Sequence, residues 1–253
     1  STPELPGWDS PWGRGRPGWH IECSAMSKSY LGKTFDIHGG GVDLVFPHHE
    51  NEIAQSCCAH DTDKMAMVWM HNGHLMVNGE KMSKSLGNFF TIREVLAEVH
   101  PEVLRYLLLA SHYRSQIHYS REACEAAKQS LIRLYTALKS DLPMDEEKYP
   151  LVEPYYGDFI QAMSDDFNTP LAVSVLFSLA NAIFKQGDKA EQAALRKTLL
   201  TCGQILGIFS EAPQIFLQNC EPGAQLSPEE IECEIANRHA ARSQKNWAEA
   251  DRI

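Results

Sequence analysis

Residues 34–71 read TFDIHGGGVDLVFPHHENEIAQSCCAHDTDKMAMVWMH and set the fold of the first part of the chain. Thr34 to His38 is a short strand candidate that three glycines end. Pro47 suits the first position of a helix that runs to about His60. Met65 to His71 is an unbroken apolar run of strand length, as expected for a buried parallel strand. The stretch therefore predicts a strand, a glycine turn, a helix and a second, parallel strand.

The predicted strands end in residues that suit a nucleotide site. In open α/β sheets ligands bind at the carboxyl ends of the strands, which is where Gly39–Gly41 and Asp43 fall. Glycines let the backbone approach a ligand closely, and Asp43 can accept hydrogen bonds from ribose hydroxyls. A glycine triplet alone is more often a plain turn. Lys81-Met82-Ser83-Lys84-Ser85 is more specific, because two lysines and two hydroxyls on a short loop can neutralise a triphosphate.

A metal site is predicted on the helix of this unit. His48 and Glu52 are four residues apart, so an imidazole and a carboxylate share one helix face, about 5–6 Å apart at Cβ. Cys23, on a separate helix expected between Gly18 and Gly32, is our choice of third ligand, and all three side chains are acceptable zinc donors. On spacing alone, an ordinary helical His–Glu pair beside a buried free cysteine remains the alternative.

Three neighbouring residues compete for the same assignment. Cys57 and Cys58 are further possible ligands near the end of the predicted helix. His49 is expected to face about 100° away from His48 on a regular helix and therefore to take no part.

After Ser85 the pattern is helical and predicts a bundle. Thr91-Ile92-Arg93-Glu94 and Ser227-Pro228-Glu229-Glu230 are capping boxes, and Ser120 can cap a long helix. Other helices are expected from Pro101, from Pro170 to Gly187 and from Leu195 to Phe209, with loops at 140–154 and 210–226. The fold class is therefore α/β followed by an all-α helical bundle.

Composition narrows the functional class. With 43% hydrophobic residues, the 253-residue chain can bury a core, and no apolar run of about 18 residues predicts a membrane span. The seven cysteines are scattered, which is typical of reduced thiols in the cytoplasm. A net charge of −10 argues against nucleic-acid binding through the overall field but leaves room for a local basic face. The start at Ser1, without Met or a leader, indicates a processed or excised piece.

Several long motifs resemble one family. Lys81–Ser85 is the KMSKS signature of class I aminoacyl-tRNA synthetases. Residues 18–26 (GWHIECSAM), 36–43 (DIHGGGVD), 46–52 (FPHHENE) and 166–170 (DFNTP) together resemble the cysteinyl-tRNA synthetase family. The resemblance covers essentially the whole chain and implies a partial Rossmann-type catalytic domain.

The resemblance also implies roles for individual residues. Cys23, His48 and Glu52 would be three of four ligands to one Zn²⁺ per subunit, with the fourth outside this chain. Catalysis would fall to Lys84 and Lys81, and the ATP site to Lys84, Gly39, Gly41 and Asp43. Trp19 would wall the cysteine pocket and His38 would lie near the substrate. For these last two, core packing and a strand-end hydrogen bond remain alternatives.

The implied domains are residues 1–85 (zinc site and KMSKS loop), 86–118 (stem-contact segment), 119–210 (helical bundle), 211–226 (linker) and 227–253 (start of a tRNA-recognition module). The implied reaction uses ATP with Mg²⁺ to activate L-cysteine and passes it to tRNA(Cys), in a cytoplasmic monomer. The first zinc cysteine and the HIGH motif of the family would precede Ser1, and His71-Asn72-Gly73-His74 is not read as HIGH. We therefore expect a fragment with little or no activity of its own.

Two other functions remain open at the level of sequence. One is the related ligase that joins activated cysteine to an amino-sugar. The other is a non-catalytic, zinc-stabilised module that binds RNA.

Overall fold

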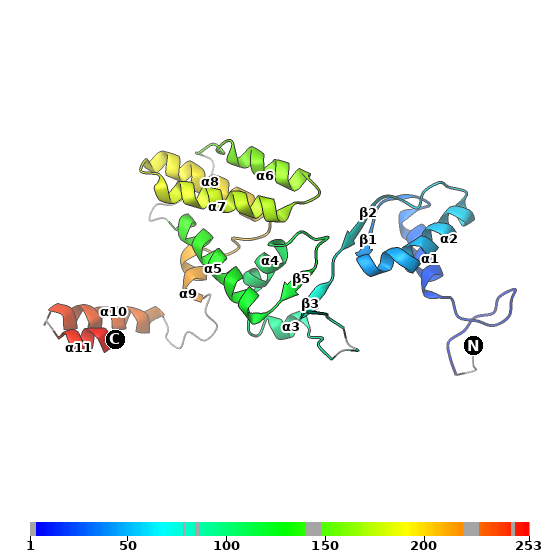
Figure 1. The fold of residues 1–253 in the computed structure, drawn as a ribbon, viewed down its shortest axis with the longest axis horizontal. Coiled ribbons are helices and arrows are strands. Elements are labelled where there is room, and N and C mark those ends of the chain that lie inside the picture. Colours follow the sequence, from blue (N-terminus) through cyan, green and yellow to red (C-terminus); the bar gives the residue numbers. More distant parts are fainter. Residues whose placement is uncertain are drawn as a thin grey trace. The chain divides into compact units, whose positions relative to one another are not determined.

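The computed structural model describes residues 4–77, 79–83, 85, 87–139, 148–219, 228–243 and 246–252. The chain forms two compact units. The first comprises Ser1–Phe89, Leu107–Ala123 and Ile160–Val173, and the second comprises Phe90–Tyr106, Cys124–Phe159 and Ser174–Ile253. No helix in the described ranges has both the length and the apolar character that a membrane crossing requires. The expected order, an α/β part followed by a helical part, is confirmed (Figure 1).

The α/β part runs from blue to cyan-green in Figure 1. Its elements are α1 (Trp19–Leu31), β1 (Phe35–Gly41), a 3₁₀ turn (Val42–Leu44), a π-helical turn (Val45–His49), α2 (Glu50–His60), β2 (Ala66–Asn72), β3 (Leu75–Val77) and β4 (Glu80–Lys81). The part that follows contains α3 (Ile92–Val95), α4 (Pro101–Leu109), β5 (Ile117–Tyr119), α5 (Arg121–Leu138), α6 (Tyr155–Ser164), α7 (Thr169–Lys185), α8 (Lys189–Ile205), α9 (Pro213–Asn219), α10 (Pro228–Ser243) and α11 (Trp247–Arg252).

Strands β1 and β2 form the predicted parallel pair. Their register runs from Phe35↔Ala66 to Gly41↔Asn72, and helix α1 packs against α2. Phe35, Met65 and Ala66 form a small hydrophobic core, and Trp69 packs against it. This arrangement brings the ends of β1 and β2 and the start of α2 together.

Two local expectations were wrong. The three glycines do not end the first strand, because Gly39, Gly40 and Gly41 pair with β2 and extend β1 to Gly41. The α-helix does not begin at Pro47 but at Glu50, after the π-helical turn. Phe46 is extended within that turn (φ −132°, ψ 133°), as expected for a residue that precedes proline.

The burial expected for the second strand is only partly present. Met65 and Ala66 are buried, but Met67 is 59% exposed and Val68 is 50% exposed. The sheet that contains β2 has two strands among the described residues, so nothing described covers these side chains. An apolar run like that of residues 65–71 is typical of strands that are buried on both faces.

A second small sheet has the order β4-β3-β5. Strands β3 and β4 form an antiparallel hairpin, while β3 and β5 are parallel. The hairpin leads into the lysine loop of residues 81–85.

In the helical part, two helices start where the sequence predicts, because a neighbouring side chain caps each of them. Thr91 and Glu94 form the capping box of α3, and Ser120 Oγ accepts a hydrogen bond from Ala123 N at the start of α5. Helix α8 was expected from Leu195, but it begins at Lys189, because Asp188 accepts hydrogen bonds from Ala190 N and Glu191 N. Helices α6 and α9 were not predicted, and Ser227 lies outside the described residues.

The core of this unit contains a buried carboxylate. Glu102 is 3% exposed and accepts hydrogen bonds from Phe209 N (2.8 Å), Ser210 N (3.1 Å), Ser210 Oγ (2.7 Å) and Tyr135 OH (3.0 Å). The ring of Tyr135 stacks on Phe216 at 3.9 Å. Burial and the nearby Glu102 carboxylate raise the pKa of Tyr135, so its hydroxyl stays a donor. Glu102, in α4, thus connects the segment after α8 with α5.

We predict that Glu102→Ala lowers the free energy of unfolding of the helical unit by about 3 kcal/mol, because several buried donors lose their acceptor. Urea unfolding followed by circular dichroism measures the change. Glu232→Ala, an exposed glutamate in α10, is the control and should change stability by less than about 0.5 kcal/mol. Equal effects of the two substitutions would contradict the role of Glu102.

Candidate metal and nucleotide site

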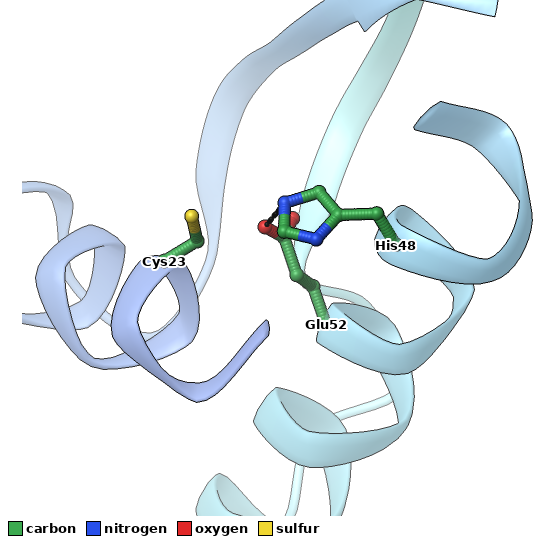
Figure 2. A group of neighbouring side chains, drawn as sticks. All are labelled: Cys23, His48 and Glu52. Atoms are coloured by element: carbon green, nitrogen blue, oxygen red, sulfur yellow. Dashed lines mark ion pairs between the residues drawn. The ribbon is translucent and has the colours of Figure 1, made fainter. Parts of the chain in front are cut away.

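Three side chains from separate elements converge beside β1. Cys23 comes from α1, His48 from the π-helical turn and Glu52 from α2. Figure 2 shows Cys23 next to the His48–Glu52 pair. One potential ligand atom from each lies within 4.8 Å of the others. Ligands around a tetrahedral zinc ion are roughly 3–4 Å apart, so a small closing movement would complete such a site.

The carboxylate of Glu52 is the most buried polar group of the cluster, at 1% exposure. Its Oε1 is 2.7 Å from His48 Nε2 and its Oε2 is 2.8 Å from His38 Nε2. Both oxygens are buried, and neither accepts a hydrogen bond from a described residue. A buried carboxylate needs a positive partner, and a divalent cation would supply one. The residues present therefore fit a zinc ion.

Two further residues hold His48. Its Nδ1 is within hydrogen-bond distance of His20 Nδ1, at 2.7 Å. The indole of Trp19 stacks on the imidazole, with ring centroids 4.0 Å apart and planes inclined by 27°. Contacts of this kind orient a ligating imidazole, with Nε2 left to face Glu52. Trp19 itself is 56% exposed, so one face of its ring is open to solvent.

The thiol of Cys23 is held in its neutral form in the structure as it stands. Burial and then the Glu52 carboxylate raise the pKa of Cys23, because both disfavour a second negative charge at this place. A bound cation would reverse that effect, since a coordinated thiol is deprotonated.

The expectation that His49 faces away was wrong. His49 is buried, lies beside His38 and Glu52, and its Nδ1 is 2.8 Å from His71 Nε2. Burial and then the nearby His38 lower the pKa of His49, so its ring is held neutral. The π-helical turn is the physical reason, because it changes the angle between successive side chains. Neither Cys57 nor Cys58 belongs to the candidate metal groups among the described residues.

Sequence reasoning missed the histidines around the predicted ligands. His20 contacts His48, His49 lies beside Glu52, and His71 contacts His49. The sequence did contain a signal for this cluster, namely the concentration of histidines: six of the eleven fall between residues 20 and 71.

The residues expected at the nucleotide follow His38 at the carboxyl end of β1. Lys81 Nζ donates to Asp43 Oδ2 at 2.8 Å, and this hydrogen bond holds the pKa of Asp43 below its usual range. Asp43 is thus paired with the lysine loop rather than open to a ribose. Gly39 lies close to β2, since an added Cβ would be 3.3 Å from Met70 O. At Gly41 an added Cβ would be 2.5 Å from Asp43 Oδ1. Lys84 lies outside the described residues.

Gly40 has a more specific role than a flexible turn. A Cβ there would lie 3.0 Å from His49 Cε1 and 3.0 Å from Leu44 Cδ1. We predict that Gly40→Ala lowers the free energy of unfolding of this unit by about 1–3 kcal/mol, because it crowds the buried imidazole. Gly15→Ala, at a position with no atom within 4 Å of the added Cβ, is the control in the same thermal unfolding assay. A Gly40→Ala protein as stable as Gly15→Ala would show that His49 is free to move.

Two family models match parts of the chain. The family described as tRNA synthetases class I (C) catalytic domain matches residues 1–129. This chain belongs to that family. A DALR domain matches residues 158–210, in the helical part of this class I synthetase chain.

Curated relatives agree with this membership. The Cysteine--tRNA ligase of Legionella pneumophila subsp. pneumophila (strain Philadelphia 1) is 55% identical over 257 residues, covering 100% of this synthetase chain and 54% of its own length. That of Shewanella baltica (strain OS185) is 53% identical, covering 99% of this chain and 54% of its own length. The chain therefore spans about half the length of the curated relatives it matches.

A solved structure shares the fold. The synthetase chain matches the structure of the ternary complex of Agrobacterium radiobacter K84 LeuRS-tRNA-LeuAMS with a TM-score of 0.59 and 18% identity. The match covers 85% of this chain and 34% of that one. At this identity the likeness concerns the fold alone.

Proposed function

We propose that the full-length protein activates L-cysteine with ATP and Mg²⁺ and transfers it to tRNA(Cys). Support comes from family membership and from relatives named Cysteine--tRNA ligase at 53–55% identity. The observation that carries the proposal is the convergence of Cys23, His48 and Glu52 beside a nucleotide-type strand end. We further propose that the protein acts as a cytoplasmic monomer.

In this proposal Cys23, His48 and Glu52 hold Zn²⁺, with a fourth ligand from outside this chain. When bound, the ion would keep the substrate sulfur as a thiolate, a soft ligand that the hydroxyl of serine does not match. Packing alone separates such similar side chains poorly. Selection between cysteine and serine therefore depends on the residues that hold the ion in place.

Trp19 and His38 are proposed to shape the amino-acid pocket. Trp19 stacks on His48 and keeps one ring face open, which suits the wall of a small apolar pocket. His38 Nε2 lies 2.8 Å from Glu52 Oε2, and His48 contacts the other oxygen, so His38 would help to fix the carboxylate. Both residues would thereby limit where a substrate sulfur can lie.

The nucleotide half of the site works by exchange of partners. Lys81 is paired with Asp43 in the structure, at 2.8 Å. The triphosphate of ATP carries more negative charge than one carboxylate and would draw Lys81 away, leaving Asp43 free to accept hydrogen bonds from the ribose. Gly39 and Gly41 would keep the backbone close to the nucleotide. Lys84, by its place in the KMSKS signature, is proposed to stabilise charge on the departing pyrophosphate.

The proposed reaction consists of two group transfers. The carboxylate oxygen of cysteine attacks the α-phosphorus of ATP, and pyrophosphate leaves with the bond electrons. A hydroxyl at the tRNA terminus then attacks the acyl carbon, loses its proton, and AMP leaves. The HIGH motif typical of the family does not occur in these 253 residues, so the chain alone is proposed to have little or no activity.

The metal assignment predicts the behaviour of two variants. Cys23→Ser and Glu52→Gln should each weaken zinc binding by roughly 100-fold or more, since changes even to residues behind the ligands cost 10–100-fold. Zinc per chain is measured by mass spectrometry of the purified protein. Co²⁺ substitution should give a sulfur-to-cobalt absorption band that Cys23→Ser abolishes. Cys58→Ser, an exposed cysteine on the same helix as Glu52, is the control and should keep both signals.

The activity assignment predicts cysteine-dependent exchange of pyrophosphate into ATP by the full-length protein, with serine a poor substitute. AMP release that depends on tRNA separates this function from cysteine–amino-sugar ligation. Zinc binding and RNA binding without exchange would instead indicate a non-catalytic module and would refute the proposed reaction.

A further inference from the structure

A strained turn joins α6 to α7. Asp166 and Phe167 are consecutive non-glycine residues with positive φ, at 53° and 54°. Such a conformation is tolerated by aspartate but is unfavourable for a bulky residue, and it persists only where surrounding contacts hold it. Phe167 is 53% exposed, so burial of its ring does not explain the conformation.

Asp166 is held by three successive side chains. Tyr113 OH donates to its Oδ1 at 2.7 Å, and Arg114 Nε lies 2.7 Å from its Oδ2. His112 Nε2 lies 3.0 Å from the main-chain oxygen of Asp166. The hydrogen bond from Tyr113, followed by the bond and charge of Arg114, lowers the pKa of Asp166, so the carboxylate is charged at neutral pH.

The segment that holds Asp166 also holds strand β3. Gly73 N donates to Tyr113 O at 2.8 Å, and Ile117 N donates to His74 O at 3.0 Å. There is no room for a side chain at Gly73, because a Cβ would lie 2.1 Å from Ser115 O. Beyond this contact β3 pairs with β5 along its whole length.

Strand β3 in turn positions β4, the strand that contains the first lysine of the loop. It pairs with β4, which contains Lys81, and Met82 N donates to Leu75 O at 2.9 Å. Lys81 reaches Asp43 beside the glycines of β1. Contacts therefore run without a break from Asp166, through residues 112–117, to the hairpin at the nucleotide site.

We propose that Asp166 is a positioning residue that fixes the β3–β4 hairpin and, through it, Lys81. The charged carboxylate orders Tyr113 and Arg114, and their main chain fixes the start of β3. The catalytic consequence rests on the proposed function, whereas the mechanical link does not.

Hydrogen–deuterium exchange of the full-length protein tests the link. Asp166→Ala should raise the exchange rate of peptides covering 73–83 by about fivefold or more, because local opening becomes easier. Tyr113→Phe combined with Arg114→Met should do the same, and it removes the two side-chain contacts while leaving the sequence of the turn unchanged. Asp165→Ala is the matched control: that side chain has no hydrogen bond or ion pair with any described residue, and its loss should leave the hairpin unchanged.

Two exchange results would overturn the proposal. One is a hairpin that exchanges at the same rate in Asp166→Ala as in Asp165→Ala. The other is an effect of Asp166→Ala that the double variant does not reproduce, because the turn rather than the side-chain contacts would then be responsible. Peptides covering α1 and α2 should stay unchanged in every variant, and a general increase there would mean unfolding and also count against the link.

Kinetics test the catalytic consequence separately. Asp166→Ala should raise the KM for ATP or lower kcat of pyrophosphate exchange by roughly tenfold, since small displacements of a catalytic group have large effects. The KM for cysteine and the zinc content should match those of Asp165→Ala. A parallel loss of zinc and cysteine binding would show a merely structural role. If the unaltered protein shows no exchange activity, the proposed function fails while the hydrogen-exchange result still decides the link.

Discussion

The buried carboxylate of Glu52 is the constraint around which the first unit is organised. It is 1% exposed, and an imidazole nitrogen lies within 2.8 Å of each oxygen. A buried carboxylate is tolerable only if positive or polar groups surround it. This requirement is consistent with the side chains of Cys23, His38 and His48, from three separate elements, lying around Glu52.

Features that depend on residues close in sequence could be predicted, whereas features that depend on distant contacts could not. The pairing of His48 with Glu52 follows from their four-residue spacing, although His48 lies in the turn before α2. Cys23 was chosen as a cysteine on a separate helix, with Cys57 and Cys58 as further possible ligands. The orientation of His49 could not be foreseen, because it depends on an extended Phe46 within a π-helical turn. The extension of β1 through Gly41 depends on pairing with Asn72, 31 residues away in sequence, which no local pattern encodes.

The helical unit follows the same rule. Thr91 and Ser120 cap their helices through neighbours three residues away, and both were predicted. Glu102 accepts hydrogen bonds from residues 107 and 108 positions further along the chain, so nothing local distinguished it from a surface glutamate. The start of α8 could have been predicted, because its cap, Asp188, is a local signal. It was missed because only the apolar periodicity was considered.

The open face of β1 and β2 has a consequence for handling this chain by itself. Ile37 and Val68 are register partners, 60% and 50% exposed, on a ribbon of two strands among the described residues. Unpaired strand edges next to exposed apolar side chains act as templates for other chains. Concentrated solutions should therefore self-associate through this ribbon despite a net charge of −10, and adding salt should speed the process by screening the repulsion between molecules.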